Sequence, residues 1–162
     1  MSNTITELTP KDMAIVIREE GFFPHIETDG DVSFKLEGTT LTFGSCAKGF
    51  VYGRLYYHLK RDDKWPAILA AQHVELSLVA IKALVVPDNE YLIFSVESLC
   101  AEKEGFRTFF IRSLSILRDA VKTFADKFLE TKSNEYGLER NCQTTQTTDR
   151  IEECLSDNNT MS

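Results

Sequence analysis

The chain is poor in the residues on which catalytic and metal sites are usually built. It has three histidines and four cysteines in 162 residues. The cysteines, Cys46, Cys100, Cys142 and Cys154, are isolated from one another and form no Cys-x-x-Cys pair, so we expect neither a zinc site nor a redox site. We expect reduced thiols, as is usual in the cytosol, and no bound cofactor or metal.

The sequence also lacks a membrane-spanning segment, a secretory signal and a basic patch. Its longest apolar stretch, Leu76 to Val86, is interrupted by Lys82 and is far shorter than the roughly 20 residues that cross a bilayer. The first seven residues have neither the basic flank nor the apolar run of a secretory signal. The formal net charge of −7 repels phosphate backbones. We therefore expect a cytoplasmic protein that binds neither nucleic acid nor membrane.

No motif predicts a catalytic residue. The histidines are His25, His58 and His73. His73 is near Glu75, but no His-Glu-x-x-His pattern is present. Residues 44–49 have the glycines of a phosphate loop, but a true one ends in Gly-Lys-Ser/Thr and leads into a helix, so we expect a flexible connection, with Cys46 as an exposed thiol. Residues 29–31, Asp-Gly-Asp, are too few for a calcium loop and favour a turn.

Hydrophobic periodicity indicates a helix followed by three strands in the first part of the chain. Thr9, Pro10 and Asp12 are typical of a helix start, and Gly21 of a helix end. Apolar and polar residues then alternate from Val32, first to Leu36 and again from Leu41 to Phe43, which predicts a hairpin. Residues 50–59 are rich in aromatic and branched side chains and predict a third strand.

The second part predicts a short helix, a second hairpin and a long helix. The short helix starts near Pro66. Strands at 77–86 and 90–100 follow, joined by a turn at 87–89. The long helix carries an apolar stripe with spacings of three and four, formed by Phe106, Phe110, Leu114, Leu117, Val121, Phe124 and Phe128. Residues 1–130 thus predict one α+β domain with a five-stranded antiparallel sheet and helices on one face, and residues 131–162 a polar, loosely held tail.

The last three strands carry more apolar residues than one buried face requires. If Val79, Ile81, Ala83 and Val85 face the core, other apolar side chains of the same strand lie opposite. The candidate partner or dimer surface is formed by Tyr52, Tyr56, Leu84, Val86, Tyr91 and Ile93. Large exposed apolar patches are rare on monomers and mark interaction sites. The alternative is that the tail or the first helix folds across this face.

The order of elements resembles the type III secretion chaperone-like fold and, within it, the YbjN-type proteins labelled bacterial sensory transduction regulators. The likeness spans residues 9–130. The likeness rests on Gly21-Phe22, the segment from Asp31 to Gly38, the aromatic third strand, the strand around Lys82 and the Phe-rich last helix. The resemblance implies a small homodimer without known catalytic residues, so no site residue is transferred from it. Secretion chaperones of this fold hold an extended segment of a partner protein.

The leading hypothesis is a non-enzymatic interaction protein that dimerises or docks a partner segment through the apolar face. The rival is a small-molecule-binding protein or small enzyme whose pocket lies between sheet and helices and is lined by His58, His73 or Cys46. A third possibility, nucleic-acid binding, has only one candidate surface, formed by Arg107, Arg112, Arg118 and Lys122. The acidic residues between them favour a solvated helix face.

Overall fold

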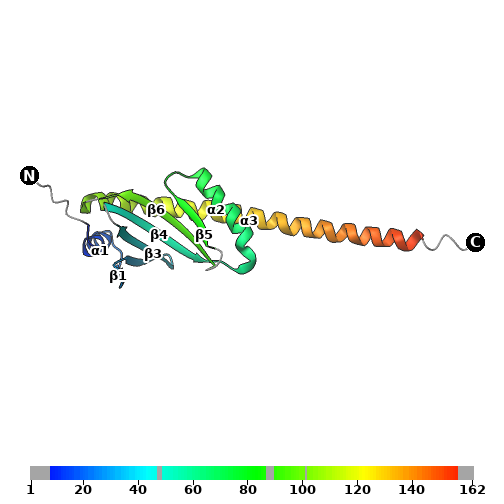
Figure 1. Cartoon of the computed structure of the whole chain (residues 1–162), viewed down its shortest axis with the longest axis horizontal. Coiled ribbons are helices and arrows are strands. Elements are labelled where there is room, and N and C mark those ends of the chain that lie inside the picture. The colour runs from blue at the N-terminus through cyan, green and yellow to red at the C-terminus, as the bar shows by residue number, and fades with distance from the viewer. Residues whose placement is uncertain (1–7, 47–48, 87–89, 101, 157–162) are drawn as a thin grey trace, which may run out of the picture.

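The chain folds around one antiparallel sheet with helices on one face. The computed structural model describes residues 8–46, 49–86, 90–100 and 102–134 in full and the backbone of the last helix to Ser156. In this part of the chain six strands lie in the order β1-β2-β3-β4-β6-β5. The long last helix runs along the sheet and projects beyond it (Figure 1). The α+β class is confirmed, with six strands in place of the expected five.

Helix α1 spans Pro10–Glu19 and starts where the sequence predicts. The Thr9 hydroxyl accepts a hydrogen bond from the Asp12 backbone N–H, and the Asp12 carboxylate accepts one from the Thr9 N–H, which completes a capping box. Gly21 follows the C-cap residue Glu20, and its φ of 91° is in the left-handed region that terminates helices. The apolar side of the helix, which includes Met13 and Ile17, is fully buried.

The first four strands are β1 (His25–Ile26), β2 (Val32–Leu36), β3 (Thr39–Cys46) and β4 (Phe50–His58). The predicted hairpin is confirmed: Leu36 pairs with Thr39. Glu37 and Gly38 between them both have positive φ, as a tight two-residue turn requires. The sequence missed β1, which is too short for alternation to be visible. Residues 44–46 were expected in a flexible connection, but they pair with β4 as the end of β3; Ala47 and Lys48 lie outside the described residues.

The last two strands are β5 (Lys82–Val86) and β6 (Tyr91–Leu99), and their predicted hairpin pairing is confirmed. β6 also pairs with the whole of β4, so the later strand lies inside the sheet and β5 forms its edge. The expected strand start at residue 77 is wrong. Leu78 and Val79 precede β5, and Val79 is 89% exposed instead of facing the core. The turn expected at 87–89 lies outside the described residues.

Helix α2 spans Lys64–Ser77, after the 3-10 turn η2 at Arg61–Asp63. Its buried side consists of small residues, chiefly Ala67, Ala70 and Ala71, together with Val74. Small side chains allow close packing against the long helix α3, which α2 contacts extensively. Glu75 of α2 reaches the sheet edge, where its carboxylate accepts a 3.0 Å hydrogen bond from the Ala83 N–H of β5.

Helix α3 spans Lys103–Ser156 and supplies the centre of the core. The predicted stripe is confirmed: Phe106, Phe110, Leu117 and Phe124 are buried, and the other members pack against the core. The Phe110 ring contacts the rings of Phe34 and Phe43 from the sheet at centroid distances of 5.7 and 5.1 Å. The helix continues past Glu130, where the sequence predicts a loose tail. The domain boundary at residue 130 stays a prediction, and the side chains after residue 134, Cys142 and Cys154 among them, lie outside the described residues.

Candidate interaction surface

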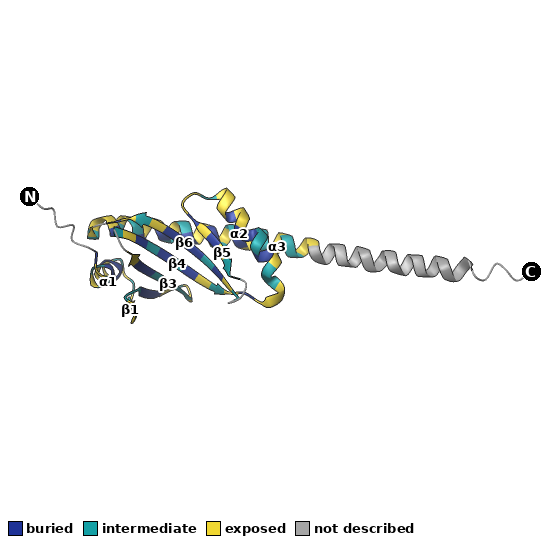
Figure 2. Cartoon of the chain, viewed as in Figure 1, coloured by how far each residue is buried: buried dark blue, intermediate teal, exposed yellow. Residues whose placement is uncertain are grey.

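The sheet has one face that the helices do not cover, which we call the open face. Buried and more exposed residues alternate along β4 and, except at the buried Ser95, along β6 (Figure 2). Every apolar strand residue of the core cluster points to the helices, and no open-face apolar residue belongs to that cluster. The open face of β4 carries Phe50, Tyr52, Arg54, Tyr56 and His58. Strand alternation therefore places all six predicted surface residues on this face.

Five of the six form two adjacent rows across three strands. Tyr56 of β4 lies opposite Ile93 of β6, and Ile93 lies opposite Leu84 of β5. In the next row, Tyr91 lies between His58 and Val86. Leu84 is 57%, Tyr91 41% and Tyr56 39% exposed, whereas Ile93 and Val86 are half-buried. We call these five residues the apolar patch.

Tyr52 is separated from the apolar patch and has a different environment. A polar row formed by Arg54, Ser95 and Lys82 lies between them. The Tyr52 hydroxyl donates a 2.6 Å hydrogen bond to Asp31. Partial burial and this hydrogen bond raise the pKa of Tyr52, so the phenol stays neutral. Tyr52 therefore holds the turn before β2 against β4, and the sequence did not reveal this partner because it lies 21 positions away.

The polar row is the part of the surface that sequence reasoning missed. The Arg54 guanidinium stacks on the Tyr52 ring at 4.1 Å. Lys82 forms a 2.7 Å ion pair with Glu97. Ser95 between them is buried, and its hydroxyl has no hydrogen-bond partner among the described residues. The alternation along each strand indicates that these residues lie on the open face. It does not show that β4 and β6 are neighbours in the sheet, which only the structure reveals. This row bounds the apolar patch on one side.

The side chains proposed for an enzyme site do not come together. His73 lies exposed on α2 beside Ser77, and His25 is exposed near Glu27. His58 lies at the end of β4 against Tyr91, with a ring distance of 5.2 Å, whereas Cys46 is at the opposite end of the open face. Cys100 is buried, which raises the pKa of its thiol. Among the residues that the structure describes, no group of His, Cys, Asp and Glu is placed to bind a metal ion.

A second feature lies on the other face, where one side of α3 leaves a groove above the sheet. Its first part, of about 250 Å³, is bordered by the β2–β3 hairpin and by Leu114, Leu117 and Arg118 of α3. Its second part, of about 320 Å³, extends to Leu59 and Leu129. Tyr57 and Val121 border both parts. We call the two parts together the α3 groove.

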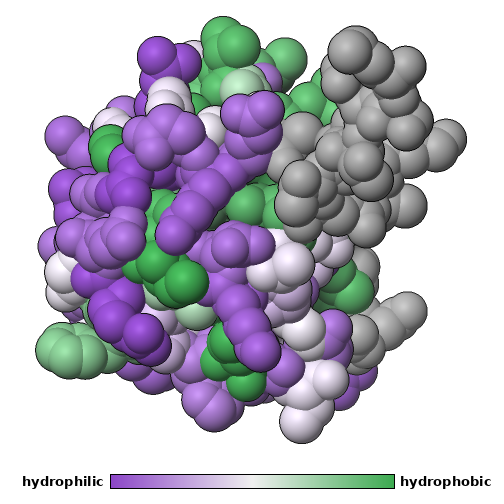
Figure 3. Space-filling model, turned by 90° about the vertical axis from the view of Figure 1, so that its left-hand side faces the viewer, coloured by the Kyte–Doolittle hydropathy of each residue, from purple (hydrophilic) through white to green (hydrophobic). Residues whose placement is uncertain are grey.

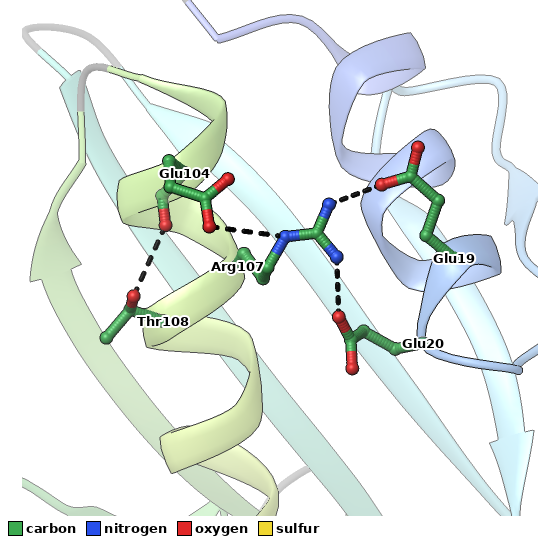
Figure 4. Close-up of polar contacts among 5 residues, drawn as sticks. All are labelled: Glu19, Glu20, Glu104, Arg107 and Thr108. Carbon is green, nitrogen blue, oxygen red and sulfur yellow. Dashed lines mark hydrogen bonds and ion pairs between the residues drawn. The ribbon is translucent and has the colours of Figure 1, made fainter.

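The same side of α3 binds α1 closer to its start. Arg107 projects from α3 between the carboxylates of Glu19, Glu20 and Glu104 (Figure 4). Its Nη1 lies 2.6 Å from Glu20 and its Nε 3.5 Å from Glu104. The ion pair with Arg107 lowers the pKa of Glu19. This end of the molecule is mainly hydrophilic, with small hydrophobic areas between the hydrophilic residues (Figure 3).

Comparison with known proteins finds matches to this chain in structure but none in sequence. No protein-family model and no curated protein matches it. The crystal structure of YbjN from E. coli, described as a proposed transcription regulator, superposes with a TM-score of 0.55 at 12% identity, over 83% of this chain and 97% of YbjN. The chain has a YbjN-like fold. The Yersinia pestis type III secretion chaperone SycH, in complex with a fragment of YscM2, matches with a TM-score of 0.46 at 10% identity, over 74% of this chain and 99% of SycH.

The YbjN-like fold confirms the resemblance expected from the order of elements. At 12% identity the likeness concerns the fold alone. In the described residues no helix is long and apolar enough to span a bilayer.

Proposed function

We propose that the chain is a non-enzymatic interaction protein that forms a homodimer through the apolar patch and docks a segment of a partner protein. The observation that carries the proposal is the register of β4, β6 and β5, which gathers five apolar and aromatic side chains in two rows on the open face. Burial of such side chains stabilises an interface by about 25 cal/mol per Å² of apolar surface. The polar row of Arg54, Ser95 and Lys82 would form its rim, as is usual at interfaces.

The position of the patch favours a second sheet as its neighbour. The patch lies on strands and reaches the edge strand β5, which carries Leu84 and Val86. Aromatic residues are enriched at the centres of protein interfaces. The dispersal of His58, His73 and Cys46 argues against the rival enzyme that would use them. A chaperone-like or regulatory role is in line with the YbjN-like fold, and cytoplasmic localisation remains part of the proposal.

Sedimentation equilibrium of the purified chain tests the dimer. The substitution Leu84→Glu places a charge in the patch, and we expect it to raise the dimer dissociation constant at least about tenfold because the carboxylate would be desolvated. The matched control is Leu99→Glu, which adds the same charge on β6, away from the patch. A wild-type chain that is monomeric at about 100 μM, a concentration at which a weak dimer with a Kd near 10 μM is mostly associated, would refute the proposed dimer.

A further inference from the structure

We infer that the α3 groove binds a partner polypeptide as an amphipathic helix with acidic residues beside its apolar face. This inference deepens the proposed function, because it names the place and the chemistry of the partner segment. It does not depend on the apolar patch, which lies on the opposite face of the sheet. The two can therefore fail separately.

The lining of the groove sets the first requirement on its ligand. In the second part, all the side chains are aliphatic or aromatic, and only Tyr57 carries a polar group. A polar small molecule would lose its hydration there without gaining hydrogen bonds. The groove also extends past Val121 along two parts of α3, so its shape favours a row of apolar side chains over a single compact ligand.

The helix α1 shows how this side of α3 binds a helix. Its apolar side, with Met13 and Ile17, is buried in the core, and its end places Glu19 and Glu20 against Arg107 of α3. The buried apolar side and the ion-pairing carboxylates thus belong to one short amphipathic segment.

Arg118 repeats the position of Arg107 farther along α3. Eleven residues are close to three helical turns, so the two arginines lie on nearly the same side of α3, about 16 Å apart. Arg118 borders the groove, its side chain is 64% exposed, and its ion pair with the exposed Glu37 is 3.3 Å long. An exposed ion pair of this kind contributes little to the stability of the fold, so the guanidinium can exchange Glu37 for a carboxylate of a ligand. The geometry thus selects an amphipathic helix with carboxylates beside its apolar face, as Glu19 and Glu20 are at the end of α1.

The test uses a synthetic 14-residue peptide with leucines at helical spacing and two glutamates beside them, and a twin with two lysines. We expect the acidic peptide to bind and to shift the methyl NMR signals of Leu114, Val121 and Leu129. Arg118→Glu should weaken its binding about tenfold and favour the lysine twin. The matched control Arg112→Glu, on another side of α3, should leave binding unchanged.

A second variant fills the groove without removing core atoms. Ala125 is exposed and borders the groove, so Ala125→Trp should abolish peptide binding while the melting temperature stays within a few degrees. The inference is overturned if neither peptide binds at about 1 mM, if both bind equally, or if the shifts are confined to Leu84 and Ile93. Shifts of the groove methyls with decanoate alone, or with protein concentration alone, would assign the groove to an apolar small molecule or to a second copy. The Leu84→Glu variant should bind the peptide as the wild type does, whatever its oligomeric state.

Discussion

The Tyr52 hydroxyl of β4 donates a 2.6 Å hydrogen bond to Asp31, a residue 21 positions earlier. The Tyr52 side chain reaches Asp31 by crossing over Gly44 of β3, where a Cβ would overlap both groups. The Arg54 guanidinium stacks on the same ring. One aromatic side chain therefore connects the turn before β2 to the centre of the sheet, and the polar row separates it from the apolar patch.

The crossing over Gly44 makes a prediction about stability. Gly44→Ala should lower the free energy of unfolding by about 1–3 kcal/mol, because the added methyl forces Tyr52 off Asp31. Urea unfolding measures the change. In the Tyr52→Phe background, where the hydroxyl is already absent, the same substitution should cost less. Equal costs in the two backgrounds would contradict the proposed role of the contact.

The raised pKa of Tyr52 predicts a loss of stability in alkali. Its causes are partial burial and the hydrogen bond to Asp31. Since the folded state favours the neutral phenol, this contribution is complete below the ordinary tyrosine pKa of about 10 and decreases as the pH rises above it. Urea unfolding at about pH 9 and about pH 11 should show a smaller decrease for Tyr52→Phe than for the wild type. Tyr91→Phe controls for the loss of a phenol, and a decrease identical in all three proteins would contradict the prediction.

The Arg107 cluster predicts a loss of stability in acid. The hydrogen bond from Arg107 lowers the pKa of Glu19 below its ordinary value of 4.5. The stabilisation is therefore complete above about pH 4.5 and is lost as the pH falls through the lower pKa of the folded state. Glu19→Gln should be less stable than the wild type at neutral pH, and the difference should disappear in acid. Glu104→Gln, which removes a more distant and more exposed carboxylate, should change the melting temperature less.

The hydrogen bond between Glu75 and β5 predicts that α2 protects the edge of the sheet. Its carboxylate accepts the hydrogen bond of the Ala83 N–H, a backbone group that β6 does not use. Glu75→Ala should lower the free energy of unfolding by about 1 kcal/mol and leave this donor free to pair with another chain. Light scattering at increasing protein concentration should then show more aggregation. Glu75→Gln keeps an acceptor and should behave as the wild type; if it aggregates as the alanine variant does, charge and not edge capping is responsible.

The local elements were largely predictable because their signals are short-range. Thr9 and Asp12 form the capping box that the start of α1 requires, and Glu37-Gly38 forms the tight turn of the first hairpin. The apolar stripe of α3 needs only the helical period. The failure at Val79 has a local cause as well. An apolar run does not show where a helix ends and a strand begins, and here α2 continues to Ser77.

The sequence by itself determined the α+β class, most helix and strand positions and the excess of apolar residues in the later strands, since propensity and periodicity act between neighbours in the chain. Only the tertiary structure decided that these additional apolar residues gather in one patch on the open face. The pairing of β6 with both β4 and β5 brings Tyr56, Ile93 and Leu84 together. Tyr52 lies apart from them and binds Asp31, which belongs to a distant turn. Such pairings depend on contacts between residues far apart in the chain, for which no local pattern exists. The same reason applies to the α3 groove, whose lining brings α3 together with residues of β2, β3, β4 and β6.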